Sequence, residues 1–281
     1  MDTDTSNISV SAHYTGYIWC RHGLAPKEFE TARGRNTYRF LSPASALIRA
    51  IIGADMETFL VERHKLLDHL LTAAIEKAGV TQVVEIACGM SPRGVSFSQR
   101  YADRGLVYVE ADLPGMAASK TQLLTQNGWI SERHQVQICN ILTPSGPESL
   151  GHLLNTLDPT KKTALITEGL VNYFDLDTLQ TFWTNITRET ARFPECRYLT
   201  EIYPDFRDHP IHRYTRIAQG VIGLVTKNEW PLHYESDAAI EAGFKQAAFQ
   251  DVIVHNPDDY RELLSLPKLP YSSFVRVVEA R

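Results

Sequence analysis

Acidic side chains interrupt or end three short apolar runs, where they could bind a polar ligand. Glu85 interrupts QVVEIACGMSPRG (82–94), Glu110 and Asp112 close VYVEADLPG, and Glu168 interrupts ITEGLVNYF. A lone carboxylate in an apolar strand is costly to bury, and a ligand ammonium would offset that cost. An acid at the end of a second strand is also the residue that holds ribose hydroxyls in nucleotide-binding folds. The pattern therefore indicates a site for an adenosine-containing ligand.

A glycine turn follows the first of these runs. Gly89 stands between a strand and a helix, and a residue without a Cβ lets the backbone approach a ligand closely. Asp112 lies nearer the carboxyl end of its strand than Glu110 and is the better candidate for the ribose. Asn140, after the third run, could hydrogen-bond an adenine amino group. Each feature also has an ordinary explanation: a plain turn, a helix cap or turn chemistry.

One guanidinium falls on the apolar side of a predicted helix. Residues 55–78 repeat apolar side chains at i, i+3, i+4 and i+7, with Asp55 as N-cap and Gly79 after the end. Arg63 lies on that stripe, four residues after Phe59. A guanidinium that faces a core needs an anion. A ligand carboxylate would supply two hydrogen bonds, and an acid of the sheet or a path to solvent is the alternative.

The elements that must position these side chains alternate between strand and helix. This alternation predicts an α/β fold with helices on both faces of a parallel sheet. Seven strands make it a mostly parallel, doubly wound sheet of Rossmann-like type. No long helix separates the last two strands, so an antiparallel pairing would make the sheet mixed. The predicted strands are 82–88, 106–113, 135–141, 163–170, 197–203, 244–254 and 273–281, and the predicted helices between them are 92–103, 115–127, 147–156 and 175–193.

Segments outside the sheet are predicted to form a helical cap and a lid. Residues 1–78 are interpreted as an N-terminal cap and residues 79–281 as the ligand-binding domain. An insertion at about 204–243 follows the carboxyl end of the fifth strand, where open α/β sheets bind ligands. Within the cap we expect a loose tail, an ordered segment and a helix, at 1–14, 15–41 and 42–54.

Composition argues against several classes of function. The 281 residues carry a net charge of −5 without an evident basic cluster, so no nucleic-acid partner is expected. No run reaches the ~18 apolar residues of a membrane span, and the polar N-terminus does not resemble a secretory signal. The four cysteines are far apart and form no CxxC pair, which argues against a metal site or a disulfide framework. We expect a cytoplasmic protein.

Taken together, the motifs resemble a known enzyme family. EIACGMSPRG, VYVEADLP and ITEGLVNYFD, preceded by a helix carrying Arg63, are similar to the leucine carboxyl methyltransferase family over residues 55–190. The likeness is to its bacterial branch of polyketide O-methyltransferases of the tetracenomycin type. It implies a class I methyltransferase fold that uses S-adenosylmethionine.

The resemblance also implies roles for individual residues. Arg63 would hold the methionine carboxylate, Asp112 the ribose, and Glu168 the amino group. Two positions depart from the family: Ala87 stands at the usual first glycine, and Asn140 replaces a common aspartate near the adenine. The predicted donor-binding set is Arg63, Glu85, Ala87, Gly89, Asp112, Leu113, Asn140, Ile141, Glu168 and Gly169.

The sequence leaves the catalytic residue open, because methyl transfer from a sulfonium depends mainly on positioning and desolvation. A hydroxyl acceptor would benefit from a base such as His22 or His212. Arg207 could hold an anionic acceptor. Tyr173 and Tyr203 could wall an apolar pocket. Each of the five is equally explained as a surface or packing residue.

The predicted function is O-methylation of a carboxylate or hydroxyl on a small-molecule metabolite, within secondary metabolism. A nicotinamide-dependent oxidoreductase of Rossmann type is an alternative that shares the glycine turn and ribose acid, although an intact GxGxxG is missing. A non-catalytic protein that binds S-adenosylmethionine is a second alternative. The acceptor and the oligomeric state are left open, with a homodimer as one option.

Overall fold

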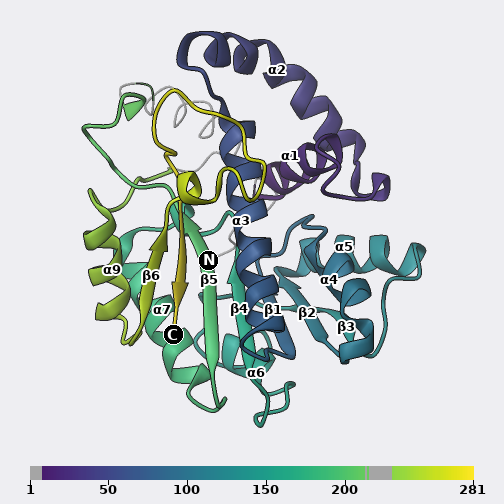
Figure 1. Cartoon of the computed structure of the whole chain (residues 1–281). Coiled ribbons are helices and arrows are strands. Elements are labelled where there is room, and N and C mark those ends of the chain that lie inside the picture. Colours follow the sequence, from purple (N-terminus) through teal and green to yellow (C-terminus); the bar gives the residue numbers. More distant parts are fainter. Residues whose placement is uncertain (1–7, 213, 215–229) are drawn as a thin grey trace.

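A seven-stranded sheet forms the centre of the computed structural model, which describes residues 8–212, 214 and 230–281 (Figure 1). The strand order is β3-β2-β1-β4-β5-β7-β6. The first five strands in this order are parallel, and β7 runs antiparallel to both β5 and β6. The predicted mostly parallel, doubly wound α/β fold is therefore confirmed. The strands are β1 Gln82–Ile86, β2 Val107–Asp112, β3 His134–Ile138, β4 Thr163–Thr167, β5 Cys196–Ile202, β6 Val252–His255 and β7 Arg276–Ala280.

Helices cover both faces of the sheet because the strand side chains are apolar on both. Val83 of β1 belongs to the core under α3, whereas Val84 belongs to the core under α6 and α7. Successive side chains of a strand point to opposite faces, so one short strand supplies both cores. On one face lie α3 Met56–Glu76, α4 Arg93–Arg100 and α5 Pro114–Gln126, and on the other α6 Leu150–Leu154, α7 Leu176–Thr190 and α9 Asp237–Gln246.

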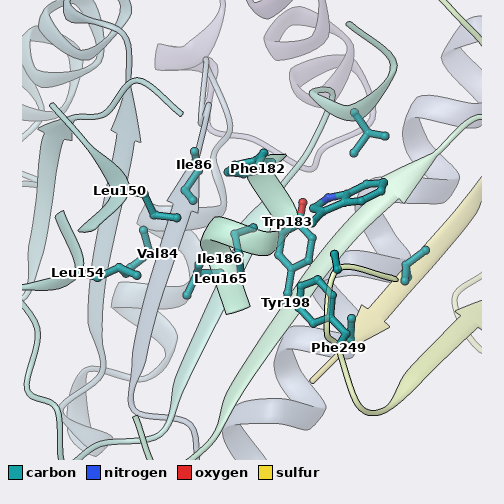
Figure 2. Close-up of a cluster of buried hydrophobic side chains, with 14 of the residues drawn as sticks. Val84, Ile86, Leu150, Leu154, Leu165, Phe182, Trp183, Ile186, Tyr198 and Phe249 are labelled. Carbon is teal, nitrogen blue, oxygen red and sulfur yellow. The ribbon is translucent and has the colours of Figure 1, made fainter. Parts of the chain in front are cut away.

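The larger core lies between the sheet and α6, α7 and α9 (Figure 2). Trp183 of α7 is fully buried and stacks on Phe244, with the two ring centroids 4.2 Å apart. Tyr198 of β5 stacks on Phe249 in the same cluster. The buried residues of α7 recur at helical spacing, at 179, 182, 183 and 186. This core fixes β4 and β5, whose carboxyl ends carry part of the site.

α3 carries Arg63 to the carboxyl edge of the sheet. The Asp55 side chain accepts a hydrogen bond from the Thr58 backbone amide, and the Thr58 side chain accepts one from the Asp55 amide, which forms a capping box. Farther along the helix, Leu66, Leu67, Leu70 and Leu71 pack on the sheet. Because the first turns extend past the strand ends, Arg63 faces the residues that follow β4 and β5.

Two further helices lie above the carboxyl edge of the sheet, α1 Ile8–Arg21 and α2 Ala32–Ile52 (Figure 1). The expected loose tail is wrong for residues 8–14, which belong to α1, while 1–7 lie outside the described residues. The predicted helix 42–54 begins earlier, at Ala32, and continues through Pro43. Thr31 caps it by accepting a hydrogen bond from the Gly34 amide.

The last part of the chain differs from the expected strand pattern. The predicted strand 244–254 is wrong in its first part, because residues 244–246 complete α9 and β6 starts only at Val252. Ile240 and Phe244 lie one turn apart and are both fully buried, so packing favours a helix there. Of the predicted insertion 204–243, residue 213 and residues 215–229 lie outside the described residues.

The boundary predicted between a cap and a domain, at residue 78, stays a prediction. α3 packs directly on the sheet, so it shares the core of the predicted second domain. Among helices of the described ranges, none is long and apolar enough to cross a membrane.

Trp183→Ala should destabilise the protein by about 3–5 kcal/mol, because it empties a large, fully enclosed volume in the core. Phe40→Ala is the matched control: Phe40 is 83% exposed, and its loss should change the unfolding free energy by less than about 0.5 kcal/mol. Urea denaturation of both variants measures the difference. Similar values for the two would contradict the assigned core.

Candidate functional site

A cavity of about 530 Å³ opens at the carboxyl edge of the sheet. Its floor is formed by residues that follow β1, β2, β4 and β5, and its walls by α1, α2 and the start of α3. This is where parallel sheets of this topology place their ligands. Seven of the ten predicted donor-binding residues line the cavity: Arg63, Ala87, Gly89, Asp112, Leu113, Glu168 and Gly169.

The glycine turn after β1 is tied to the acid at the end of β2. The Gly89 amide donates to Asp112 Oδ2 at 2.7 Å, and the Leu113 amide donates to Oδ1 at 2.7 Å. Burial raises the pKa of Asp112, and these two amides act in the opposite direction. Because each carboxylate oxygen can accept more than one hydrogen bond, Asp112 still has capacity for a ligand hydroxyl at the cavity wall.

The turn is compressed between the sheet and α1. Gly89 has φ +49°, and a Cβ there would lie 3.0 Å from the Cβ of Ala12 on α1. Ala87 has φ +54°, a left-handed conformation that costs a residue with a Cβ about 1–2 kcal/mol. The position where the family usually has a glycine therefore carries backbone strain in this chain.

Lys120 of α5 supports the same turn from below. Its ammonium is completely buried and donates to the carbonyls of Ser91 at 2.6 Å and Gly89 at 3.4 Å. It also pairs with Glu110, which in turn bonds His134 Nε2 at 2.7 Å. Glu110 is thus a structural acid, and Asp112 is the one of the pair that lines the cavity.

Arg63 is buried at the centre of the cavity floor. Its Nε donates to Glu168 Oε1 at 3.1 Å, and its Nη1 lies 3.2 Å from Glu201 Oε1. Gly169 makes room for it, since a Cβ there would lie 3.1 Å from Arg63 Nη2. Pairing with acids of the sheet, one of the two explanations left open above, is therefore observed. Nη2 makes no hydrogen bond with a described residue and remains available to a ligand carboxylate.

Glu168 is the most strongly neutralised acid of the site. Besides Arg63 it binds His64 Nδ1 at 2.9 Å and Arg93 Nη2 at 2.6 Å. Burial alone would raise its pKa, but His64, Arg93 and Arg63 together hold the pKa of Glu168 well below its ordinary value. Glu168 is therefore ionised at neutral pH.

The argument that a ligand must neutralise Glu85 is wrong. Arg93 Nη1 binds Glu85 Oε1 at 2.5 Å, and the Tyr108 hydroxyl donates to Oε2 at 2.7 Å. Arg93 comes from α4, directly after the glycine turn, and is itself almost completely buried. Glu85 does not line the cavity; it supports Arg93, which holds Glu168.

A fourth strand-end acid, Glu201 of β5, was missed by the sequence analysis. It is 98% buried and lines the cavity. Its Oε1 accepts from the Gly169 amide at 2.6 Å and from Arg63, but its Oε2 has no hydrogen-bond partner among the described residues. The signal was present in RYLTEIY, where an acid interrupts an apolar strand as Glu85 and Glu168 do.

The remaining predicted site residues divide between the cavity and the surface. Tyr173 and Tyr203 line the cavity, and Tyr203 OH lies 3.5 Å from Arg63 Nη1. The other five lie outside its lining. The Asn140 side chain accepts a hydrogen bond from the Leu142 amide within its own turn, and Ile141 lies in the same turn. His22 forms a hydrogen bond with Glu57, and His212 forms one with Asp205. Arg207 forms ion pairs with Asp205 and Glu235.

The charges beside the cavity do not balance. Arg63, Arg93 and His64 face the carboxylates of Glu168, Glu201, Glu85 and, at the rim, Asp68. The three buried carboxylates outnumber the two buried guanidiniums, whereas Asp68 is 32% exposed at the rim. An excess of buried negative charge favours a ligand that brings positive charge.

The other half of the cavity is apolar and aromatic. Phe59, Tyr203, Ile211, Trp230 and Phe274 form one buried cluster there. The Asn172 side chain bonds both the amide and the carbonyl of Tyr203 and also the carbonyl of Pro231, which fixes this wall to the end of β5. The site therefore joins a polar, charged half to an apolar half. Within the described residues, no group of His, Cys, Asp and Glu is arranged to hold a metal ion.

The sequence pattern of the family described as leucine carboxyl methyltransferase matches residues 29–187, which is more than half of the chain. The chain belongs to this family. It is thereby assigned to the S-adenosylmethionine-dependent methyltransferases, and the resemblance drawn from the motifs is confirmed.

Individual relatives agree with the family assignment. A protein of Parafrankia sp. (strain EAN1pec), assigned as an S-adenosyl-L-methionine-dependent methyltransferase, is 31% identical over 48% of this chain and 42% of its own length. A protein of Mycobacterium sp. (strain KMS) with the same assignment is 27% identical over 73% of this chain and 70% of its own length. The match thus spans less than half of the first relative and about two thirds of the second.

The fold also agrees. A crystal structure from Thermobifida fusca YX, assigned as a methyltransferase, superposes with a TM-score of 0.66 at 14% identity, covering 96% of this chain and 93% of that one. Identity this low supports the shared fold alone.

S-adenosylmethionine fits the residues of the charged half. Its sulfonium and ammonium would meet the excess carboxylate charge, its carboxylate the Nη2 of Arg63, and its ribose the free capacity of Asp112. The family assignment and this donor set agree on a methyl donor and give no support to a nicotinamide cofactor.

Ala87→Gly should leave stability unchanged or raise it by up to about 1 kcal/mol, because glycine adopts a positive φ without strain. Ala111→Gly in β2 is the matched control. Ala111 is fully buried in a strand of ordinary conformation, so the same change should destabilise by about 1 kcal/mol. Thermal unfolding measures both stability changes. A gain or no change for Ala87→Gly with a loss for Ala111→Gly supports strain at Ala87, and equal losses of stability in the two variants contradict it.

Glu168→Gln should lower the unfolding free energy by about 3–5 kcal/mol at neutral pH, because the buried guanidiniums of Arg63 and Arg93 lose the negative charge of this partner. The pKa of Glu168 is lowered by folding, so its stabilising effect is present above the ordinary pKa of about 4.3 and is lost as pH falls. The deficit of the variant should therefore narrow on acidification. Urea denaturation as a function of pH measures this, and a deficit that widens on acidification would be inconsistent with the network.

Proposed function

We propose that the protein transfers a methyl group from S-adenosylmethionine to an oxygen atom of a small, largely apolar metabolite. The observation that carries this proposal is the single cavity that joins two chemically different halves. One half offers Asp112, Arg63 and Glu168 to a charged nucleoside amino acid, and the other offers aromatic walls to the apolar part of an acceptor.

Methyl transfer from this donor makes modest demands on the protein. S-adenosylmethionine supplies a methyl group already activated on a sulfonium. The chain has to hold donor and acceptor in line and keep water away. Arg63, fixed by two carboxylates, and Asp112, fixed by two amides, orient the donor half. Helix α1 packs directly on the glycine turn, because a Cβ on Gly89 would lie only 3.0 Å from the Cβ of Ala12.

The shape of the acceptor half favours a small molecule. Ile48 and Ile52 of α2 close it from above, and Trp230 and Phe274 close it from the side. A concave pocket of this size buries most of the surface of a small ligand. Oxygen is proposed as the acceptor atom because the family is named for carboxyl methylation.

Arg63→Lys should weaken binding of S-adenosylhomocysteine by about 100-fold. A lysine ammonium cannot reproduce the planar guanidinium, which binds Glu168 and Glu201 and would at the same time bind the ligand carboxylate. The lysine keeps the positive charge, so the fold should persist. Isothermal titration calorimetry measures the affinity, and thermal unfolding verifies the fold.

Arg207→Lys is the control for this change, since Arg207 is 68% exposed and lies outside the cavity. Its affinity for S-adenosylhomocysteine should stay within about twofold. A wild-type protein that binds NAD but not S-adenosylhomocysteine would overturn the proposed function. Tight binding without methyl transfer to any acceptor would favour the non-catalytic alternative.

A further inference from the structure

Helix α2, at the outer margin of the molecule above the sheet, presents apolar side chains to solvent (Figure 1). Phe40 is 83% exposed, and Leu47 and Ile51 are each 63% exposed; they are three of the four most exposed large hydrophobic residues in the described ranges. Spacings of seven and four residues place them on one side of the helix. Pro43 and Ala44 are exposed between them on the same side. The result is a continuous apolar row along α2.

The opposite side of α2 lines the cavity. Leu41, Ser45, Ile48 and Ile52 recur at helical spacing and belong to the cavity lining. Ala44, at the edge, lines the cavity and is also exposed. α2 is therefore a wall one helix thick between the apolar half of the cavity and solvent. A surface helix normally turns its polar face to water, so packing against the cavity does not explain the outer apolar row.

α2 is also basic. Arg35 pairs with Glu30 and Arg49 with Asp55, yet the two arginine side chains remain 43% and 53% exposed. Arg39 is exposed and forms no ion pair with a described residue. The whole chain has a net charge of −5, so the positive charge of this helix is local. From residue 32 to residue 52 the sequence contains no Asp or Glu and has arginine at positions 33, 35, 39 and 49.

The combination favours an anionic lipid surface as the occupant of this face. A helix that lies flat on a membrane has an apolar row, which enters the boundary between headgroups and acyl chains, and basic side chains beside it, which meet anionic headgroups. A few apolar side chains are enough for such a contact, because the surrounding lipid adapts to them. The outer face of α2 has both features.

A protein partner fits this face less well. In a two-fold dimer a second copy would present the same face, and the arginines of one α2 would then lie against those of the other. A standard protein interface buries about 800 Å² per partner, whereas three side chains of at most about 150–250 Å² each do not reach that area. The apolar row alone is too narrow for the core of such an interface.

We propose that the outer face of α2 docks on the surface of an anionic phospholipid bilayer. Phe40, Leu47 and Ile51 enter the boundary between headgroups and acyl chains, and the arginines of α2 contact lipid phosphates. The helix lies in the plane of the surface and does not cross it. The apolar half of the cavity is then one helix away from the lipid phase, in which apolar compounds concentrate. This inference goes beyond the proposed function and does not depend on it.

Sedimentation of the full chain with lipid vesicles tests the docking. Vesicles of phosphatidylcholine that contain about 30% phosphatidylglycerol should bind the protein at least about tenfold more tightly than vesicles of phosphatidylcholine alone. Salt at about 1 M should weaken this binding, because it screens the arginines from the headgroups. Equal affinity for the two kinds of vesicle, or no binding to either, would overturn the proposal.

Two pairs of variants locate the contact. Leu47→Ala should weaken binding to the anionic vesicles by about tenfold, because fewer apolar carbons enter the lipid. Leu142→Ala is the matched control, since Leu142 is 51% exposed in the loop after β3, and its affinity should stay within about twofold. Arg39→Gln should weaken binding at low salt by about fivefold, whereas Arg188→Gln, 66% exposed on α7, should stay within about twofold.

The remaining outcomes identify a different occupant. Binding to anionic vesicles that Leu47→Ala leaves unchanged would show a contact made by charge alone and would overturn the docking of the apolar row. A lipid-free dimer that Leu47→Ala converts to a monomer, without vesicle binding, would assign the face to a second copy; sedimentation velocity measures this.

A measurement of donor affinity separates this inference from the proposed function. Leu47 lies outside the cavity lining, so Leu47→Ala should bind S-adenosylhomocysteine within about threefold of the wild-type protein. Thermal unfolding of each variant verifies the fold. Loss of vesicle binding with unchanged affinity for S-adenosylhomocysteine supports a separate docking surface, and parallel loss of both would contradict it.

Discussion

A buried ionic cluster at the carboxyl edge of the sheet is the constraint on which the rest of the site depends. Arg63 and Arg93 lie between Glu85, Glu168 and Glu201, all almost completely inaccessible to solvent. Burying so many charges is tolerated only when geometry and hydrogen bonds are good. The excess of carboxylate over guanidinium leaves an electrostatic deficit, and a cationic methyl donor would reduce it. The excess of buried carboxylates therefore destabilises the ligand-free protein, and the same excess attracts a cationic donor.

The fold supplies the geometry that this cluster needs. Parallel strands end at a common edge, so acids that are far apart in sequence come within the width of one guanidinium. α3 brings Arg63 from one side through a capped first turn, and α4 brings Arg93 from the glycine turn. Lys120, buried beneath the same turn, donates hydrogen bonds to the carbonyls of Gly89 and Ser91 and so fixes the turn. Each cation comes from a helix and each acid from a strand or its end.

Sequence reasoning located the site where the signal was local. Glu168 and Asp112 were identified because an acid at the end of an apolar strand is recognisable within ten residues, and both line the cavity. The same reasoning failed for Glu85, because its partner Arg93 reaches it only once α4 has packed on the sheet. It also missed the length of α2, where Pro43 suggests a break that the folded helix does not make.

The sequence by itself determined the class of fold and the alternation of strands and helices from residue 82 to β5, and it pointed to the carboxyl edge of the sheet as the binding edge, because hydrophobic periodicity and glycine turns act over short distances. Only the tertiary structure decided which carboxylates have hydrogen-bond donors on both oxygens and which carboxylate has an oxygen without a donor. Glu85 and Glu201 look alike in sequence, each an acid in an apolar strand. They differ because two donors bind both oxygens of Glu85, whereas one buried oxygen of Glu201 has no hydrogen-bond partner among the described residues. The donors on Glu85 are Arg93 and Tyr108, 8 and 23 positions away, whereas Arg63 reaches Glu201 from 138 positions away. No local pattern encodes these contacts, because they form only once the helices have packed on the sheet.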